Sequence, residues 1–260
     1  MKKLIKRWLF GKCPGLSGRF PYFGCTVYFP KGSQAFEAVC QQGIFEQANA
    51  NLLRNLSASQ SHVFDVGANI GLMALPILEG VPDCIVVSCE PSPNALPWLL
   101  RTVKESRYSA RWKIIPKAVG SEPGRADFFT STRGLGMYDG LRSSNQVTSV
   151  GKVSVEVTTL DHEWDKLGRP PVSVLKIDVE GAEAAVLRGA SSCLAECRPH
   201  ILLEWNRKNL GAFNSPAGFL FQFASENKYR LFAMPMLVPV LSQTDFRLQM
   251  ALTESFLLAP

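Results

Sequence analysis

The sequence predicts an α/β fold built on a mostly parallel sheet, and three observations support this. Short apolar runs of strand length alternate with longer segments of helical periodicity. Residues 62–71, HVFDVGANIG, read as a strand, a tight glycine turn and the start of a helix. The 260 residues, of which 46% are hydrophobic, are enough to bury a full core. Alternating strands and helices of these lengths form parallel sheets with right-handed crossovers.

The same patterns locate each expected element along the chain. Strands are expected at 22–30, 62–65, 85–89, 112–116, 172–177, 201–205, 229–234 and 252–258. Helices are expected within 34–56 and at 72–78, 95–106, 182–189 and 219–226, with a loop at 117–120.

The alternation is interrupted at residues 124–159. Two stretches, 126–129 and 153–158, alternate like antiparallel strands around a glycine- and serine-rich loop at 131–149. Such a loop beside a pocket is either a lid that contacts substrate or a disordered connection. Its candidate contact residues are Tyr138, Asp139 and Arg142.

Charge is concentrated at the amino end of the chain. The formal net charge is +6, but residues 1–31 contain seven lysines and arginines and no acid, so the remainder carries −1. A neutral globular part argues against a protein that coats nucleic acid. The seven cysteines form no C-x-x-C pair, and several lie in apolar runs. This favours a reduced, cytoplasmic compartment and argues against a structural metal site.

Residues 1–12, MKKLIKRWLFGK, place apolar and basic side chains on different helical faces. The apolar stretch is too short and interrupted for a signal peptide or a membrane span. Two interpretations remain open. The preferred one is a helix docked on the domain with a solvated basic face, and the other is contact with the anionic inner face of a membrane. We expect a basic segment at 1–20 and one domain at 21–260, of which residues 21–61 precede the sheet.

Acidic residues stand where the expected strands end: Asp65, Glu90, Asp178 with Glu180, and Glu204. The carboxyl ends of parallel strands meet at one edge of a sheet, where ligands bind in such folds. Carboxylates gathered there repel one another unless a cationic ligand, a metal ion or hydrogen bonds offset their charge. The sequence therefore predicts a pocket for a cationic ligand, in which a carboxyl group of raised pKa could act as a general base.

The turn after residue 65 favours one kind of nucleoside ligand. It lacks the G-x-G-x-x-G pattern that wraps a pyrophosphate, so it is not suited to bind a dinucleotide. S-adenosylmethionine has no phosphate and carries a sulfonium cation, which suits an acid such as Asp65 beside a glycine turn. Gly67 and Gly71 are expected to let this ligand approach the backbone. Glu90, at the end of the next strand, is expected to accept the ribose hydroxyls.

The remaining polar candidates are weighed by their position along the strands. His62 and His200 stand at the amino ends of their strands, away from the expected pocket, and are interpreted as structural. His162 stays a candidate base, and Asp161 beside it is interpreted as a helix N-cap. Glu46 is expected on a solvated helix face, and Glu183 is expected to interact with a helix dipole.

Several motifs together resemble one family. DVGANIG at 65–71, EPSP at 90–93 and above all LKIDVEGAEAAVLRGA at 175–190 are similar to the FkbM family of S-adenosylmethionine-dependent methyltransferases, and so are GIFEQ at 43–47 and TTLD at 158–161. The resemblance runs from about Tyr22 to the carboxyl terminus. It implies the class I methyltransferase fold, a Rossmann-like, seven-stranded, mostly parallel sheet with helices on both faces. Family members commonly methylate hydroxyl groups of sugars or of polyketide products.

The resemblance implies cofactor contacts for Asp65, Gly67, Asn69, Gly71 and Glu90, and it implies that Asp178, Glu180 and Gly181 lie at the methyl-transfer edge. The other candidates below are named for their position in the sequence. The expected cofactor-binding residues are Asp65, Gly67, Ala68, Asn69, Gly71, Glu90, Pro91, Ala118 and Asp178. Asp178, Glu180, Glu204 and His162 are the candidate catalytic residues, with Asp178 as the preferred general base. A divalent metal ion is possible at the carboxylates but is not implied.

Other functions remain open beside O-methylation of a hydroxyl on a sugar, glycan or small metabolite. One alternative is a methyltransferase acting on nucleic acid, but such enzymes usually have an Asn/Asp-Pro-Pro-aromatic motif where this chain has DVEG. A methyltransferase acting on protein is a related alternative. A further alternative is a protein that binds S-adenosylmethionine without catalysis. The presence of all the matching acids argues against this alternative. A dehydrogenase on the same architecture is the least favoured, because the turn lacks a phosphate cradle.

Overall fold

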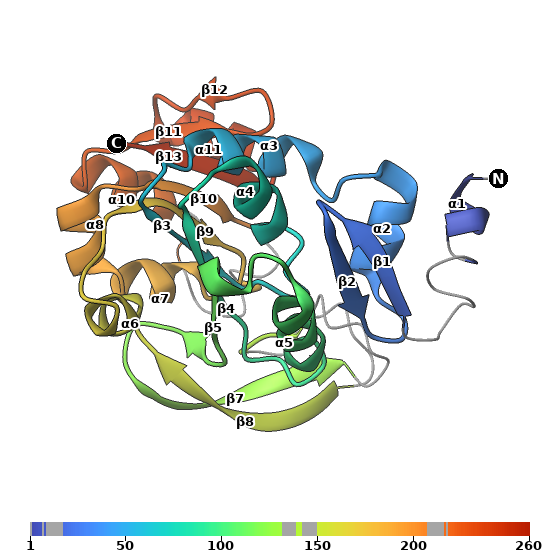
Figure 1. Cartoon of the computed structure of the whole chain (residues 1–260). Helices are drawn as coiled ribbons and strands as arrows, with labels where there is room; N and C mark the ends of the chain where they lie inside the picture. Colours follow the sequence, from blue (N-terminus) through green and yellow to red (C-terminus); the bar gives the residue numbers. More distant parts are fainter. Residues whose placement is uncertain are drawn as a thin grey trace.

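The computed structural model is organised around an eight-stranded sheet with the order β12-β11-β13-β10-β9-β3-β4-β5 (Figure 1). The structure describes residues 2–6, 8, 18–131, 139–141, 150–206, 216 and 218–260. The strands of this sheet are β3 (His62–Val66), β4 (Ile85–Cys89), β5 (Trp112–Ile115), β9 (Val172–Ile177), β10 (His200–Glu204), β11 (Arg230–Ala233), β12 (Val238–Pro239) and β13 (Ser255–Ala259).

Most strands of this sheet are parallel. β5, β4, β3, β9 and β10 pair in parallel, and β13 runs antiparallel between β10 and β11. The seven-stranded, mostly parallel sheet expected from the sequence is therefore confirmed. The short edge strand β12, which pairs with β11, extends it and was not predicted.

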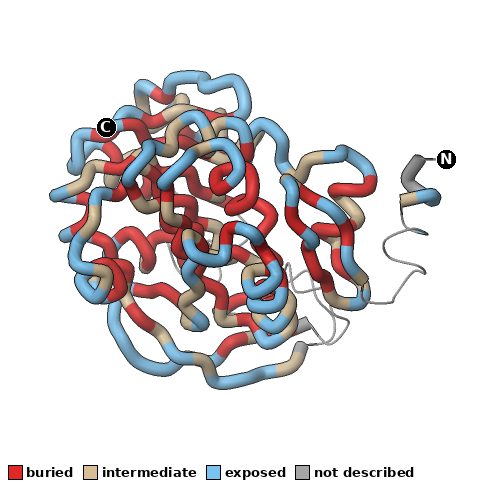
Figure 2. The backbone as a smooth tube through the Cα atoms, in the orientation of Figure 1, coloured by how far each residue is buried: buried red, intermediate tan, exposed pale blue. Residues whose placement is uncertain are grey.

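Helices cover both faces of the sheet, and its centre is buried (Figures 1 and 2). Phe64 and Val66 of β3 face one side, and Val63 faces the other, as the two-residue repeat of a strand requires. The helices packed on the Phe64 side are α6 (Leu160–Lys166), α7 (Glu183–Arg188), α8 (Ser191–Cys197), α10 (Phe219–Glu226) and α11 (Gln243–Gln249). Those on the Val63 side are α3 (Gln47–Leu56), α4 (Ala74–Gly80) and α5 (Leu96–Glu105), which is followed by the 3-10 helix η2 (Ser109–Arg111).

The segment before the sheet is a hairpin followed by two helices. Residues 22–30 were expected to form one strand, and this is wrong: β1 (Gly18–Tyr22) and β2 (Cys25–Phe29) pair antiparallel. Phe23 and Gly24 have φ angles of 44° and 69°, so they form a tight turn inside the apolar run. Helices α2 (Gln34–Gln42) and α3 follow, and α1 (Lys2–Lys6) lies beside α2 at one end of the molecule (Figure 1).

The interruption at residues 124–159 forms a second sheet. β7 (Gly124–Ser131) and β8 (Val150–Thr158) pair antiparallel, which confirms the predicted pairing. The expected loop at 117–120 contains β6 (Ala118–Val119), which pairs in parallel with β8. This three-stranded sheet lies against the carboxyl edge of the main sheet, where the expected pocket should be (Figure 1).

Helix starts differ from the prediction around residue 161. Thr159, not Asp161, caps α6, because its side chain accepts the backbone N–H of His162. The Asp161 carboxylate instead accepts the N–H groups of Ser192 and Cys193 at the start of α8, with distances of 2.9 Å each. Asp161 is therefore a capping residue, but of a helix that the sequence analysis did not predict.

Candidate functional site

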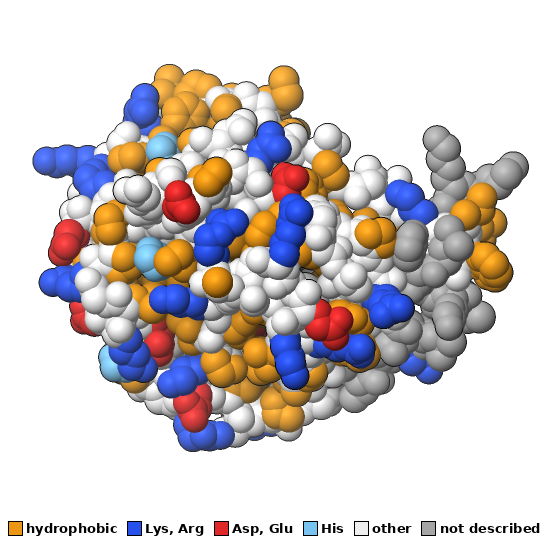
Figure 3. All heavy atoms as spheres, in the orientation of Figure 1, with side chains coloured by type: hydrophobic (Ala, Val, Ile, Leu, Met, Phe, Trp, Pro, Cys, Tyr) orange, Lys and Arg blue, Asp and Glu red, His pale blue; other side chains and the backbone are white. Residues whose placement is uncertain are grey.

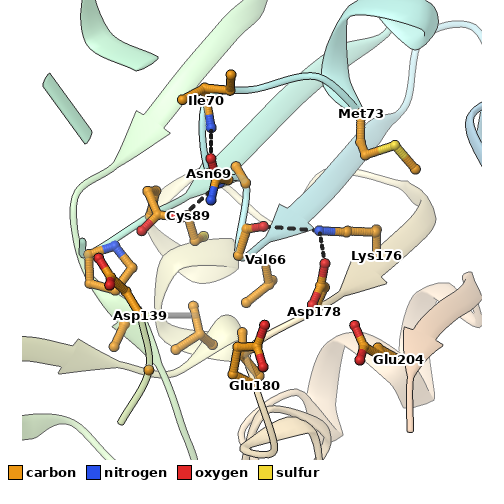
Figure 4. Close-up of a pocket in the computed structure, with 18 of the residues that line it drawn as sticks. Val66, Asn69, Ile70, Met73, Cys89, Asp139, Lys176, Asp178, Glu180 and Glu204 are labelled. Carbon is orange, nitrogen blue, oxygen red and sulfur yellow. Dashed lines mark hydrogen bonds and ion pairs between the residues drawn. The ribbon is translucent and has the colours of Figure 1, made fainter. Parts of the chain in front are cut away.

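A pocket lies at the carboxyl ends of β3, β4, β9 and β10 (Figure 4). It holds about 970 Å³ of space, including its open mouth, which is within the range of small-molecule sites, roughly 300–1,000 Å³. The main-sheet turns form one side, which we call the floor. Phe128 of β7 and residues 139–141 form another side, which we call the wall. Ala35, Phe45 and Glu46, from the segment before the sheet, complete the lining.

The register of the parallel strands explains which strand-end acids reach the pocket. Val66 is level with Cys89 and with Ile177, and Ile177 is level with Leu203. The next residue in each strand is therefore Gly67, Glu90, Asp178 or Glu204, and all four line the pocket.

Asp65 lies deeper, level with Lys176 of β9. It is 1% exposed and is not among the pocket-lining residues. The expectation that Asp65 lies beside the ligand is therefore wrong. Its carboxylate pairs with the Lys176 ammonium group at 3.3 Å, beneath the floor.

Lys176 is a pocket residue that the sequence analysis missed. Its buried ammonium group reaches the carbonyl oxygen of Gly67 at 3.0 Å and Asp178 at 3.4 Å (Figure 4). It also lies 3.3 Å from Asp65. Burial lowers the pKa of Lys176, but the carboxylates of Asp178, Asp65 and Glu46 outweigh this and raise it above its usual value. Lys176 therefore stays charged. The available signal was a single charged residue inside the apolar strand VSVLKI.

The glycines of the first turn allow close packing within the protein. A Cβ atom on Gly67 would lie 1.8 Å from the carbonyl oxygen of Asp178, so the β3 and β9 turns touch only because residue 67 is glycine. A Cβ atom on Gly71 would meet Trp112 and Leu99 at 2.5 and 2.8 Å. Gly71 does not line the pocket, so its expected place beside the ligand is wrong. Ala68 and Asn69 do line it.

Glu90 is buried at the end of β4, and its carboxylate is held by the backbone. One oxygen accepts the N–H of Asn69 and the other accepts the N–H of Ser92, each at 2.7 Å. Burial raises the pKa of Glu90 to about 7, although these two hydrogen bonds favour the ionised form. Each carboxylate oxygen can accept more than one hydrogen bond, so Glu90 can still accept from a ligand. Pro91, which follows it, also lines the pocket.

Asp139 fastens the wall to the loop that follows β4. Its carboxylate accepts hydrogen bonds from the Ser92 hydroxyl at 2.5 Å and the Asn94 side chain at 3.0 Å. Gly140 forms two backbone hydrogen bonds with Phe129 of β7, which fix the same short segment to the second sheet. We call the bonds from Asp139 to Ser92 and Asn94 the clip. The other candidate contact residues of this loop, Tyr138 and Arg142, lie outside the described residues.

Three carboxyl groups gather where β9 and β10 end: Asp178, Glu180 and Glu204 (Figure 4). Burial, together with the carboxylates of Asp178 and Glu180, raises the pKa of Glu204 to about 9. Glu204 is therefore protonated at neutral pH. Asp178 also pairs with Lys176. The sequence analysis expected a carboxyl group of raised pKa among the acids at the strand ends, and Glu204 is such a group.

Glu183 holds the turn that carries these groups. Its side chain is 2% exposed and accepts the N–H groups of Val179 at 3.2 Å and Gly181 at 2.9 Å. Burial raises the pKa of Glu183 to about 7, and these hydrogen bonds partly oppose the rise. Glu183 therefore shapes the turn directly, in addition to its expected place in the first turn of α7.

The other candidates divide between the pocket and the surface. Ala118 of β6 lines the pocket, as expected. Glu46 is exposed, as expected, but it stands between α2 and α3 with a φ angle of 42° and lines the pocket as well. His162 is exposed on α6 and does not line the pocket, so its expected place as a candidate base is wrong. His62 and His200 begin β3 and β10, at the opposite edge.

Two further features bear on ligands and location. Among the residues that the structure describes, no three His, Cys, Asp or Glu side chains are grouped to hold a metal ion. In the same part of the chain, no helix combines the length and the apolar character needed to cross a membrane.

Comparison with known proteins places these features in context. Residues 65–231 match the methyltransferase FkbM domain. None of the curated proteins compared with the chain matches it.

Among solved structures, the chain is similar to the methyltransferase FkbM from Methylobacillus flagellatus KT, with 14% identity and a TM-score of 0.49. The match covers 78% of this chain and 44% of that one, so the chain spans less than half of that protein's length. It is also similar to the Bacillus cereus O-methyltransferase in complex with SAH, with 10% identity, a TM-score of 0.46 and coverage of 82% and 79% of the two chains. It is similar as well to the precorrin-6y C5,15-methyltransferase from Geobacter metallireducens GS-15, with 10% identity, a TM-score of 0.42 and coverage of 72% of each chain.

Proposed function

Because this chain belongs to the FkbM methyltransferase family, we propose that it uses S-adenosylmethionine to methylate a hydroxyl group of a sugar, glycan or small metabolite. The observation that carries the proposal is the distribution of carboxyl groups in one pocket. Glu90 lies on the β4 side, with Asp139 of the wall near it, while Asp178, Glu180 and Glu204 gather on the β9 and β10 side. The first arrangement suits a ribose, and the second suits a cation and an acceptor hydroxyl.

The residues present fit the cofactor at both ends. Glu90 would accept the ribose hydroxyls, since its oxygens are already oriented by the N–H groups of Asn69 and Ser92. The carboxylates at Asp178 and Glu180 favour a positively charged sulfonium group, because opposite charges attract strongly in a partly buried site. Bound there, S-adenosylmethionine supplies an electrophilic methyl group.

Asp178 is the proposed general base. A protonated hydroxyl is a poor nucleophile, so forming the new O–CH₃ bond requires that its proton move to an acceptor. Lys176 lies 3.4 Å from the Asp178 carboxylate and orients it, and a carboxylate can take that proton. Glu204 is protonated beside it and would not compete as a base at neutral pH. Lys176 acts through Asp178 and is a positioning residue.

Transfer of an isotopically labelled methyl group tests the function. The chain is incubated with methyl-labelled S-adenosylmethionine and a panel of nucleotide sugars, glycans and cell extracts, and labelled products are identified by mass spectrometry. We expect an O-methylated product with wild type and much less with Glu90→Ala. Cofactor binding without any labelled product would favour a non-catalytic binding protein. Label recovered only in nucleic acid or protein would refute the proposed class of acceptor.

A further inference from the structure

The amino-terminal helix presents apolar side chains that the domain does not cover. Leu4, Ile5 and Trp8 are 69%, 50% and 72% exposed. Leu4 and Ile5 belong to α1 and precede Trp8 by four and three residues, and positions three and four apart are neighbours on one side of a helix. Figure 3 shows hydrophobic side chains at the end of the molecule where Figure 1 places α1. These three side chains therefore remain largely open to solvent, although α1 lies beside α2.

The charge beside these side chains is of one sign. Lys2, Lys3, Lys6 and Arg7 belong to the same short stretch, and the whole of residues 1–31 contains seven basic residues and no acid. The rest of the chain has a net charge of −1, so this segment carries the entire positive excess. A partner for the segment must therefore offer both an apolar layer and a high density of negative charge.

A second group of exposed apolar side chains lacks this charge. Met236, Leu241 and Leu252 are 80%, 80% and 81% exposed around β12 and α11. Residues 234–254 contain one arginine and two acids, so this surface has no basic character. This surface can serve as a control for α1, because its apolar side chains are equally exposed but it lacks the basic residues.

We propose that the segment including residues 2–8 docks the protein on an anionic lipid surface. Leu4, Ile5 and Trp8 would enter the boundary between head groups and acyl chains, a position that tryptophan favours because its ring is apolar and its N–H is polar. The positive charge of the same stretch would be attracted to the lipid phosphates. This inference is independent of the methyl transfer proposed above.

Sedimentation of the full chain with vesicles tests the inference. One set of vesicles contains phosphatidylglycerol and phosphatidylcholine, and the other contains phosphatidylcholine alone. We expect pelleting with the anionic vesicles, and a decrease in pelleting as salt is raised from about 0.05 to 0.5 M, because salt screens the attraction. Pelleting with neither vesicle, or equal pelleting with both at every salt concentration, would overturn the inference.

Matched variants separate α1 from the other apolar surface. Leu4→Glu combined with Trp8→Glu should reduce the vesicle partition coefficient by about tenfold or more, since both charge and apolar contact are lost. Met236→Glu combined with Leu252→Glu changes equally exposed residues and should pellet as wild type does. Unchanged thermal unfolding would show that both variants are folded. An equal decrease in vesicle binding of the two variants would refute the role of α1. The role would also be refuted if the protein did not bind vesicles at all and the α1 variant lost only self-association.

Discussion

Asp65 and Asp178 are each followed by valine at the end of a buried strand, yet the structure gives them different surroundings. Asp65 is level with Lys176 in the sheet, so Asp178 lies two residues, about 7 Å, farther toward the carboxyl edge. Asp65 is 1% exposed and pairs with Lys176, whereas the Asp178 side chain is 33% exposed and lines the pocket. Depth along the strand, rather than residue type, separates the acid beneath the pocket from the acid that lines it.

The largest effect should come from replacing the two aspartates separately. Asp178→Asn keeps the shape of the side chain but cannot take a proton, so kcat should fall by about 10²–10⁴-fold while cofactor binding is kept. Asp65→Asn should instead lower the free energy of unfolding by about 1–3 kcal/mol and leave most of kcat. Steady-state kinetics and urea denaturation of both variants measure the contrast. If Asp178→Asn turns over at the wild-type rate, either positioning alone drives transfer or Glu204 is the base.

Lys176→Met tests the link between the two aspartates. Removing the ammonium group leaves the Asp65 carboxylate buried without its cationic partner, so the free energy of unfolding should fall by about 3–5 kcal/mol. Lys113→Met, at an exposed position of β5, is the matched control and should change the free energy of unfolding by less than about 0.5 kcal/mol. Denaturant unfolding measures both. The double variant Lys176→Met with Asp65→Asn should recover part of the loss, and no recovery would mean that the two groups are not coupled.

Glu90 extends the comparison to a third strand. It is level with Asp178 rather than with Asp65, so it should affect the ligand more than the fold. Glu90→Ala should weaken binding of S-adenosylmethionine by about 1.5–3 kcal/mol, the range for hydrogen bonds to a charged group. Titration calorimetry measures this, with Glu79→Ala at an exposed position of α4 as the control. Unchanged affinity in Glu90→Ala would remove Glu90 from the proposed ribose contact.

Glu204 should give the smallest effect, which is a dependence on pH. Its pKa of about 9 means that it is protonated at neutral pH in the free protein. A sulfonium cation nearby favours the ionised form, so binding should lower this pKa and release up to about one proton near pH 8. Affinity for S-adenosylmethionine should therefore increase as pH rises toward 9. Calorimetry in two buffers of different ionisation enthalpy measures the number of protons released on binding. This release should be absent in Glu204→Gln. It should be smaller when the ligand is the uncharged thioether product of the cofactor.

The acids at the strand ends could be identified from the sequence because apolar runs stop at them. Their relative depth could not, because it depends on the register between strands that are far apart in the chain, such as β3 and β9. The same register brings Lys176 beneath the pocket, although its sequence context is an ordinary buried strand. Asp139 reaches the pocket through the pairing of Gly140 with Phe129, which the residue pattern of the loop does not reveal.

Most elements of the fold followed from local periodicity, and the exceptions have local causes. The turn at Phe23 and Gly24 interrupts a continuous apolar run, so two strands look like one. Helix α11 has the sequence QTDFRLQ, in which Phe246 is the single residue buried in the core, so its periodicity is weak. It begins at Ser242, whose hydroxyl accepts the N–H of Asp245. Strand β12 is only two residues long and was too short to recognise.

The wall of the pocket comes from a hairpin whose strands belong to a different sheet from the floor. Because β7 and β8 pair mainly with each other, residues can be inserted or deleted between them without shifting the register of β3, β4 and β9. The turns after β3 and β9 have no such freedom, since Gly67 already touches the Asp178 carbonyl. The hairpin can therefore be lengthened, shortened or replaced by a foreign one while the turns after β3 and β9 keep their geometry.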